Sequence, residues 1–331
     1  MSTPVVSVIV PHFNQPAALA QCLESLMAQS IDPASFEVIV GDNGGIDDPA
    51  ALLRLGDNIR IVRETRRGAA HARNAALREA RGAKIAFTDA DCVTDAHWLA
   101  GGLSALDAAD YVGGAVAVTV ADPSAITATE AFERVFAFRQ RLYVEQKSFS
   151  ATANLFVTRA AADKIGPFKP GVSEDVDWGE RAGALGLRSV FDAKAIVNHP
   201  ARSSWDELVS KWDRMIRERW NGYRSLAPES RADRVRWIML AGATALSWAP
   251  HLWTVASTDR LTRVRDRLAA AGVLIRLRCW RGARMIAVMQ EDRLLSVEKK
   301  DGSAAGAAHQ EEVSSWRRAP RPRRCPGRLV R

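Results

Sequence analysis

Two aspartates in the first third of the sequence are the residues best suited to chemistry. Asp89 and Asp91 directly follow an apolar run, with one residue between them. Carboxylates at this spacing can share a divalent cation, Mn²⁺ or Mg²⁺, through hard oxygen ligands, and a diphosphate could complete the coordination. The alternative for the triplet taken alone is a solvated turn.

Two other apolar runs also end in polar or aromatic residues. The first run ends in Pro11, His12, Phe13 and Asn14, and Asp42 follows the second. Asp42 could accept hydrogen bonds from a base N–H, and Phe13 could stack on a base. An Asx-turn and an aromatic residue of a minor core are the simpler interpretations of the two residues.

A third candidate group lies further along the chain. Glu174 and Asp175 open a predicted helix, where acidic residues suit the positive end of the helix dipole. Either carboxylate could alternatively serve as a general base. His199 precedes Pro200, and a lone histidine is more often structural than a ligand.

The elements that must position these residues alternate along the chain. This alternation predicts an α/β fold with a Rossmann-like, mostly parallel sheet and helices on both faces. The polar clusters are expected at the carboxyl ends of strands, along one rim of the sheet, where ligands bind in open α/β sheets. We predict strands at Val5–Val10, Phe36–Val40, Ile59–Val62 and Ala83–Thr88, and helices at Ala17–Ala28 and Ala69–Ala80.

The middle of the chain is less regular. The patterns there predict strands at Tyr111–Val120, Ser150–Val157, Ser189–Phe191 and Ala195–Val197, and helices at Ala125–Gln146, Glu174–Leu185 and Ser203–Tyr223. None of the four cysteines belongs to a CxxC pair or has a histidine at metal-ligand spacing, which argues against a zinc site. The plain interpretation is reduced thiols in a cytosolic protein.

The net charge of +8 is unevenly distributed. Residues 1–200 carry 19 Lys and Arg against 24 Asp and Glu, whereas residues 201–331 carry 27 against 14. Residues 231–288 mix arginines with long apolar stretches and tryptophan, a combination that suits an anionic membrane surface better than nucleic acid. Trp237–Thr258 contains no charged residue, yet Pro250 and several polar residues make it a poor membrane span.

We therefore divide the chain into a catalytic domain at 1–225, a basic, apolar helical extension at 226–290 and a disordered tail at 291–331. A helical hairpin packed on the catalytic domain is the alternative to membrane contact. No signal peptide is visible, so the catalytic part is expected in the cytoplasm, peripheral on the inner face of the cell membrane if the extension binds lipid.

The order and spacing of six motifs resemble family 2 glycosyltransferases with the GT-A fold. The resemblance runs from about Val5 to about His199. The motifs are VSVIVPHFN, EVIVGDNGG, RGAAHARNAAL, AKIAFTDADC, TANLFVTRAAADKIGPF and SEDVDWGERAGALG.

This resemblance implies a role for each matching position. Pro11, Phe13, Asn14, Asp42, Arg73 and Asp89 correspond to nucleotide-binding positions, and Asp91, Asp89 and His199 to the metal site. Asn154 and Trp178 are placed on the sugar and acceptor side. Asp175, with Glu174 beside it, corresponds to the general base of an inverting displacement on a nucleotide sugar, UDP-sugar being favoured.

The sequence departs from the family pattern at two places. Asn43, Gly44 and Gly45 follow Asp42 where an acid and a serine are usual, which puts ribose or diphosphate contacts there in doubt. Ile216 stands at the glutamine position of the motif that precedes Arg219-Trp220 in processive members. We therefore expect one sugar to be added per encounter, to a glycan or lipid-linked acceptor in cell-surface polysaccharide, glycolipid or other glycan synthesis.

Two other functions are compatible with parts of this pattern. A nucleotidyltransferase also uses carboxylates and a metal, but it would usually show a Gly-rich phosphate loop after the first strand, which Pro11–Asn14 does not supply. A catalytically inactive nucleotide-sugar binding or scaffold protein would not need the acidic residues Asp42, Asp89, Asp91 and Asp175.

Overall fold

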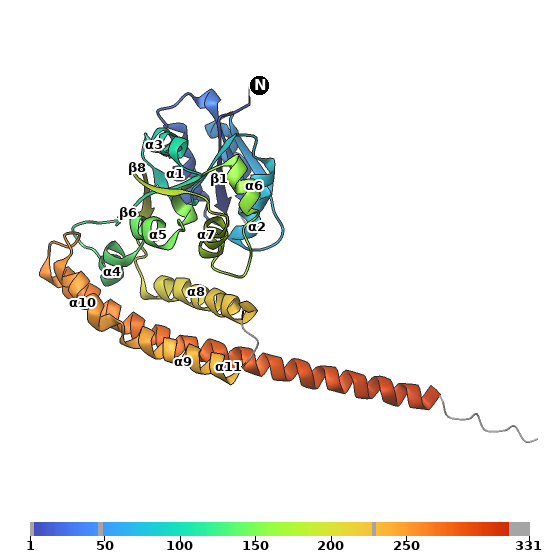
Figure 1. The fold of residues 1–331 in the computed structure, drawn as a ribbon. Helices are drawn as coiled ribbons and strands as arrows, with labels where there is room; N and C mark the ends of the chain where they lie inside the picture. Colours follow the sequence, from blue (N-terminus) through green and yellow to red (C-terminus); the bar gives the residue numbers. More distant parts are fainter. Residues whose placement is uncertain (1–2, 46–48, 227–229, 318–331) are drawn as a thin grey trace, which may run out of the picture.

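One eight-stranded sheet organises the first two hundred residues (Figure 1). The computed structural model of the chain describes residues 3–45, 49–226 and 230–317, and of residues 225–226 and 294–317 the backbone alone. The strand order is β3-β2-β1-β4-β7-β6-β8-β5. The strands are β1 (Val6–His12), β2 (Phe36–Asp42), β3 (Ile59–Arg63), β4 (Lys84–Phe87), β5 (Val93–Thr94), β6 (Tyr111–Thr119), β7 (Leu155–Thr158) and β8 (Ser189–Pro200).

The sheet is mostly parallel, as the alternating pattern predicts. β1 pairs in parallel with both β2 and β4, and β2 with β3, which sets the predicted polar clusters side by side at one rim. β7 runs antiparallel between β4 and β6, and β6 pairs in parallel with β8. β7 starts at the rim that carries Asp89, where Leu155 pairs with Phe87, and it runs away from that rim.

Helices cover both faces of the sheet. α1 (Pro16–Met27) and α3 (Trp98–Ala105) contribute to the core on one face. α2 (Ala69–Glu79), α6 (Arg159–Ile165) and α7 (Glu174–Ala184) contribute to the core on the other. Helices α3 and α6 lack a strong sequence pattern and were not predicted.

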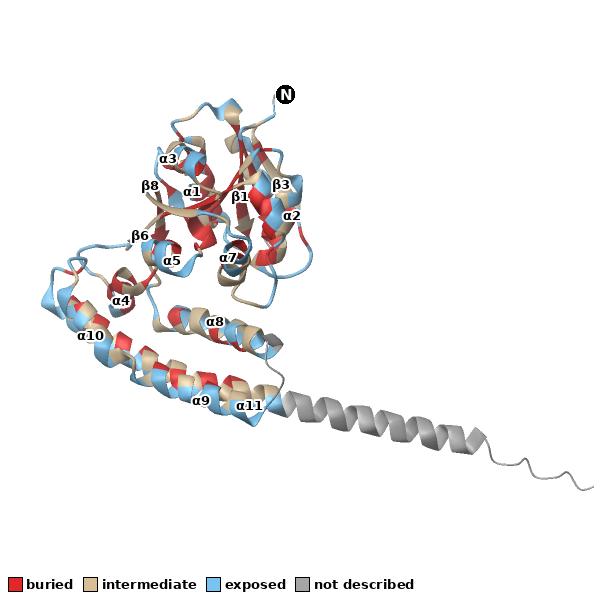
Figure 2. Cartoon of the chain, in the orientation of Figure 1, coloured by how far each residue is buried: buried red, intermediate tan, exposed pale blue. Residues whose placement is uncertain are grey.

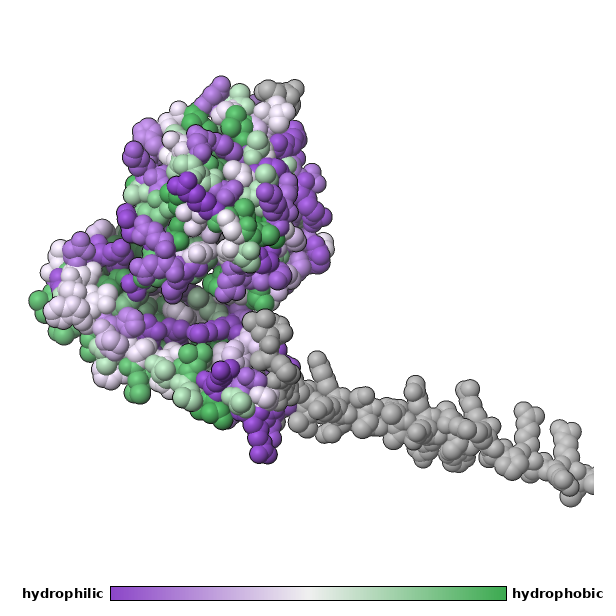
Figure 3. Space-filling view, in the orientation of Figure 1, coloured by the Kyte–Doolittle hydropathy of each residue, from purple (hydrophilic) through white to green (hydrophobic). Residues whose placement is uncertain are grey.

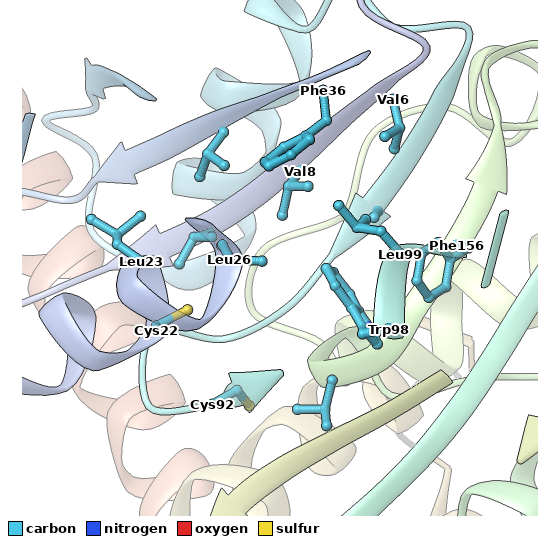
Figure 4. Close-up of a cluster of buried hydrophobic side chains, with 14 of the residues drawn as sticks. Val6, Val8, Cys22, Leu23, Leu26, Phe36, Cys92, Trp98, Leu99 and Phe156 are labelled. Carbon is cyan, nitrogen blue, oxygen red and sulfur yellow. The ribbon is translucent and has the colours of Figure 1, made fainter. Parts of the chain in front are cut away.

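The larger core lies between β1, β2 and helices α1 and α3 (Figure 4). Its residues are fully or nearly fully buried, and burial of such side chains stabilises a fold by roughly 1.5–3 kcal/mol each before the entropy cost. The labelled members are Val6, Val8, Cys22, Leu23, Leu26, Phe36, Cys92, Trp98, Leu99 and Phe156.

Three predictions for the middle region were wrong. The predicted strand Ser150–Val157 begins only at Leu155, because Thr152–Asn154 forms a short 3₁₀ turn. The predicted helix Ala125–Gln146 is two helices, α4 (Ala128–Phe136) and α5 (Gln140–Lys147), separated at Phe138, whose φ of 48° lies in the left-handed region. The two short strands predicted between 189 and 197 are one strand, β8, with an irregularity opposite Gly114 and Ala115. Aperiodic local irregularities of this kind leave no mark on hydrophobic spacing.

The C-terminal part is a layer of helices below the rim of the sheet (Figure 1). α8 (Trp205–Leu226) lies next to the catalytic domain, and α9 (Arg231–Leu246) and α10 (Trp248–Ser257) run alongside α11 (Val264–Arg317). Buried residues of α4, α8, α10 and α11 form one shared core, and those of α8, α9 and α11 form a second.

One side of these helices packs as the hairpin named above as the alternative to membrane contact, and this packing does not involve their opposite side. None of the described helices is both long enough and apolar enough to cross a membrane. The tail predicted as disordered from residue 291 has a helical backbone as far as Arg317, in keeping with its Ala, Glu and Lys content. Residues 318–331 lie outside the described part of the chain.

Candidate active site

A cleft of about 700 Å³ opens at the carboxyl ends of β1 and β4. Its volume falls within the range of small-molecule sites in proteins. The rim of the sheet forms one wall, the start of α7 a second, and α8 with the α4–α5 connection closes the far side. Of the residues predicted from sequence, the cleft is lined by Pro11, Phe13, Arg73, Asp89, Asp91, Glu174, Asp175 and His199.

Asp91 and His199 form a wall with two acceptors facing each other. His199 Nδ1 lies 2.7 Å from the Pro200 carbonyl oxygen, which assigns the ring proton to Nδ1 and leaves the lone pair on Nε2. That Nε2 lies 3.5 Å from Asp91 Oδ2. Burial and then the Asp89 charge raise the pKa of Asp91, and only a protonated His199 would oppose that shift. Asp91 Oδ2 and His199 Nε2 are therefore two acceptors that lie close together, and the carboxylates of Asp91 and Asp89 repel each other. A divalent cation suits such an arrangement.

Cys92 also lies within reach of this wall. Its sulfur, an Asp91 carboxylate oxygen and a His199 nitrogen are all within 4.8 Å of one another. Burial raises the pKa of the Cys92 thiol well above its usual value, so the thiol stays neutral. A neutral thiol is a poor ligand for Mg²⁺ or Mn²⁺, which leaves Asp91 and His199 as the residues of this group that suit a hard cation. Asp89, predicted as a further ligand, is not part of the group, and its Oδ1 accepts from Arg73.

Arg73 joins the two acidic sides of the cleft. Its Nη2 donates to Asp89 Oδ1 at 2.7 Å, and its Nη1 donates to Glu174. Burial alone would lower the pKa of this guanidinium, but Glu174, Asp89 and Asp175 together raise it above its usual value. The residue predicted to bind the nucleotide is therefore also the link that positions α7 against the rim of the sheet.

Asp175 is the carboxyl best prepared to act as a base. Burial, then the neighbouring charge of Glu174, raise the pKa of Asp175 from 3.8 to about 7. Its Oδ1 accepts one hydrogen bond, from the Thr152 backbone N–H at 3.3 Å. The carboxylate of Glu174, by contrast, is committed to Arg73. A group whose pKa lies near neutrality accepts and releases protons readily, and Asp175 meets that condition.

The aromatic end of the cleft is built around Phe13. Its ring is 40% exposed, and the guanidinium carbon of Arg67 lies 5.0 Å from the ring centroid. A flat apolar surface covered by a guanidinium is suited to stacking with a nucleotide base. Pro11 lines the cleft beside it, whereas Asn14 is not among the lining residues.

Asp42 is held away from the open cleft. It is 1% exposed, and its carboxylate lies 3.4 Å from His12 Nδ1 and 3.6 Å from Arg63 Nε. His12 Nε2 accepts from the Gln15 backbone N–H, which places the ring proton on Nδ1, facing Asp42. Asp47, the next acidic residue after Asp42 in the sequence, lies outside the described residues.

The structure does not bring Asn154 and Trp178 to the cleft, so placing them on its sugar and acceptor side needs correcting. Asn154 is fully buried, accepts from Trp98 Nε1 at 2.9 Å and donates to the carbonyl oxygens of Ala115 and Ala195. Trp178 is 3% exposed and packs against aromatic neighbours in the core. Both residues therefore belong to the buried structure behind the cleft and do not line it.

Several cleft residues were missed because they belong to no motif. Arg202 and Lys211 line the cleft near His199, and both contact the buried carboxylate of Glu133, at 3.2 and 3.1 Å. Arg214 on α8 is also a lining residue. The amphipathic pattern of α8 predicts a helix, but it does not predict which part of the protein the charged face of that helix contacts. In the structure this face supplies Lys211 and Arg214 to the cleft.

The fold and the site together define a glycosyltransferase of the GT-A type. Residues 7–166 match the family described as Glycosyl transferase family 2. Glycosyltransferase AglE from Haloferax volcanii is 32% identical over 217 residues, which cover 63% of this chain and 70% of that protein. The chain belongs to glycosyltransferase family 2.

Two further proteins match this chain over a shorter stretch or at lower sequence identity. Hyaluronan synthase from Pasteurella multocida is 37% identical over 99 residues, 28% of this chain and 10% of that protein. The structure of mannosyltransferase PcManGT from Pyrobaculum calidifontis, in complex with GDP-Man and Mn²⁺, superposes with a TM-score of 0.56 at 18% identity. That superposition covers 88% of this chain and 87% of the other, and it supports the fold.

Proposed function

We propose that this chain is an inverting, metal-dependent hexosyltransferase that moves one sugar from a nucleoside-diphosphate sugar to an acceptor hydroxyl. The observation that carries the proposal is the joint placement of Asp91 and His199 on one side of the cleft and Asp175 on another. Arg73 links the two sides through Asp89 and Glu174. A donor held beside Asp91 and His199 would present its anomeric carbon toward Asp175.

Each residue then has a task in a single displacement. Asp175 accepts the proton of the acceptor hydroxyl as that oxygen attacks the anomeric carbon from the side opposite the leaving group. Phe13 and Arg67 hold the base, and Arg202 and Lys211 offer positive charge near the phosphates. Mn²⁺ or Mg²⁺, held by Asp91, Asp89 and His199, would neutralise charge on the departing diphosphate. One displacement inverts the anomeric configuration.

The family and the cleft support a proposal for the donor class and for the acceptor. The complex of the mannosyltransferase with GDP-Man and Mn²⁺ supports a nucleotide sugar and a cation as ligands here. We favour a UDP-sugar as donor and a glycan or lipid-linked acceptor, in cytoplasmic synthesis of cell-surface polysaccharide, glycolipid or another glycan. Ile216 is buried among the C-terminal helices, which supports addition of a single sugar.

Thermal shift with a panel of UDP-, GDP- and dTDP-sugars, with and without Mn²⁺, tests the donor, because a selective ligand stabilises the fold by mass action. Release of nucleoside diphosphate from the stabilising donor tests turnover, and proton NMR of the product gives its anomeric configuration. Binding without release, in the wild type and under every acceptor tried, would favour the scaffold alternative. Retention of configuration would contradict the single displacement.

A further inference from the structure

The C-terminal helices leave a set of large apolar side chains uncovered. We call this set the outer face. Trp253 is the most exposed member, at 75%, and the least exposed, Ile275, is still at 37%. The outer face consists of Val235, Ile238, Met239 and Leu246 on α9, Trp253 on α10, and Val264, Leu268 and Ile275 on α11.

The outer face is separate from the core that folds these helices. On α9 the exposed Val235, Met239 and Leu246 recur at helical spacing, whereas Trp237 and Ala241 on the opposite side are buried in a shared core. On α11 the buried Ala270, Leu274 and Leu277 serve the other shared core, and Val264, Leu268 and Ile275 point away from it. The helices therefore pack without using the outer face.

The outer face lies away from the cleft. α9 and α10 run beside α11 below α8, and exposed residues follow their lower side (Figure 2). Hydrophobic residues are interspersed with polar ones along this lower edge of the molecule, on the side opposite the catalytic domain (Figure 3). A partner could cover this edge and leave the cleft, above α8, open to donor and acceptor.

Exposed arginines lie beside the outer face at two places, whereas others, such as Arg276 over Trp205 and Arg281 over Trp212, face α8. Residues 231–293 contain twelve arginines, no lysine and five acidic residues. Arg231 and Arg236 are exposed at the start of α9, and Arg260, Arg263 and Arg265 are exposed where the chain turns from α10 into α11. Apolar side chains flanked by guanidinium groups match an anionic bilayer surface, where the former enter the acyl boundary and the latter meet headgroup phosphates.

We propose that the outer face docks the protein on anionic lipid membranes, with α9, α10 and α11 lying in the plane of the interface. A second copy of the chain is the less favoured occupant, because two arginine rims brought together would repel. This proposal does not depend on the proposed chemistry.

Flotation of the full chain with vesicles tests the proposal, in the absence of nucleotide. Vesicles of phosphatidylcholine with phosphatidylglycerol are compared with phosphatidylcholine alone, at low and high salt. The variant carries Met239→Glu, Trp253→Glu and Leu268→Glu, and the matched control carries Val5→Glu, Leu53→Glu and Leu185→Glu. The control residues are exposed apolar side chains of the catalytic domain, at 41–51% exposure, so both variants change the charge equally.

The wild type and the control should float with anionic vesicles at low salt, and the variant should partition more than about tenfold less. Circular dichroism verifies that both variants keep their helices. The proposal is overturned if the wild type stays unbound, or if the control loses binding as fully as the variant. It is also overturned if sedimentation shows a dimer that the variant disperses while vesicles bind neither protein.

Discussion

Replacing Asp175 by Asn should remove transfer and at the same time stabilise the protein. The amide has the shape of the carboxyl and keeps an oxygen that can accept from the Thr152 N–H. It cannot accept a proton from an acceptor hydroxyl. It also removes a negative charge that lies beside Glu174 and Asp89 in a partly buried site.

The size of the stabilisation follows from the pKa of Asp175. A rise from 3.8 to about 7 in the folded protein corresponds to at most about 4 kcal/mol, at about 1.4 kcal/mol per pH unit. Water in the cleft screens part of this charge, so we expect about 1–2 kcal/mol. The folded state holds the Asp175 proton more tightly than the unfolded state does. The ionised carboxylate therefore lowers the free energy of unfolding of the wild type by an amount that is zero below pH 4, grows as the pH rises and is complete above pH 7.

Urea unfolding of both proteins at pH 4 and at pH 8 measures the difference. The variant should be about as stable as the wild type at pH 4 and more stable at pH 8. Transfer should fall by roughly a hundred- to ten-thousand-fold, the usual worth of a general base. The wild-type rate should rise with pH through about 7, as Asp175 loses its proton.

Asp177→Asn is the matched control on the same helix. Its carboxylate pairs with Lys169 and Arg181, so the variant should be slightly less stable at pH 8 and should keep its activity. The reasoning is refuted if Asp175→Asn loses stability at pH 8, or if the stability difference is the same at both pH values. A loss of transfer below about tenfold would move the base to Glu174 or Asp177.

Three other substitutions test the remaining parts of the site. Asp91→Ala should abolish Mn²⁺-supported donor binding in calorimetry while the fold survives; near-wild-type binding would remove its metal role. Asn154→Ala should lower the free energy of unfolding in urea by about 3 kcal/mol, because the buried Trp98 N–H and two carbonyl groups lose their partner; a loss under about 1 kcal/mol would contradict that. Lys211→Met should cost about 2–3 kcal/mol by leaving the Glu133 carboxylate with one cation, and adding Glu133→Gln should recover part of the loss; strictly additive losses in the double-mutant cycle would refute the coupling.

Local patterns were enough to predict the scaffold and much of the rim. The β-branched runs and the helical spacing gave β1–β4, α1, α2 and α7 to within a residue or two, because side chains of these elements alternate in and out of the core in a fixed period. Asp89, Asp91, Glu174 and Asp175 could be chosen because each begins the chain segment directly after a strand or at the start of a helix. The sequence did not show which side chains lie next to these four residues in the folded protein.

The break at Phe138, the burial of Asn154 and the placement of Lys211 and Arg214 at the cleft each involve long-range contacts. Asn154 is placed by partners 39, 41 and 56 residues away in sequence, and the α8 cations reach the cleft only because that helix folds back under the sheet. A single sequence without aligned relatives holds no record of such distances.

The sequence by itself therefore determined the type of fold, the family and the acidic residues at the rim, since these depend on local period and on motif order. Only the tertiary structure decided that Arg73 links Asp89 to Glu174, that Asp42 faces His12, and that the apolar residues of the extension divide into a buried core and an outer face. The reason is physical: charge pairing and burial are properties of the space between elements, and that space is defined only when the elements have packed.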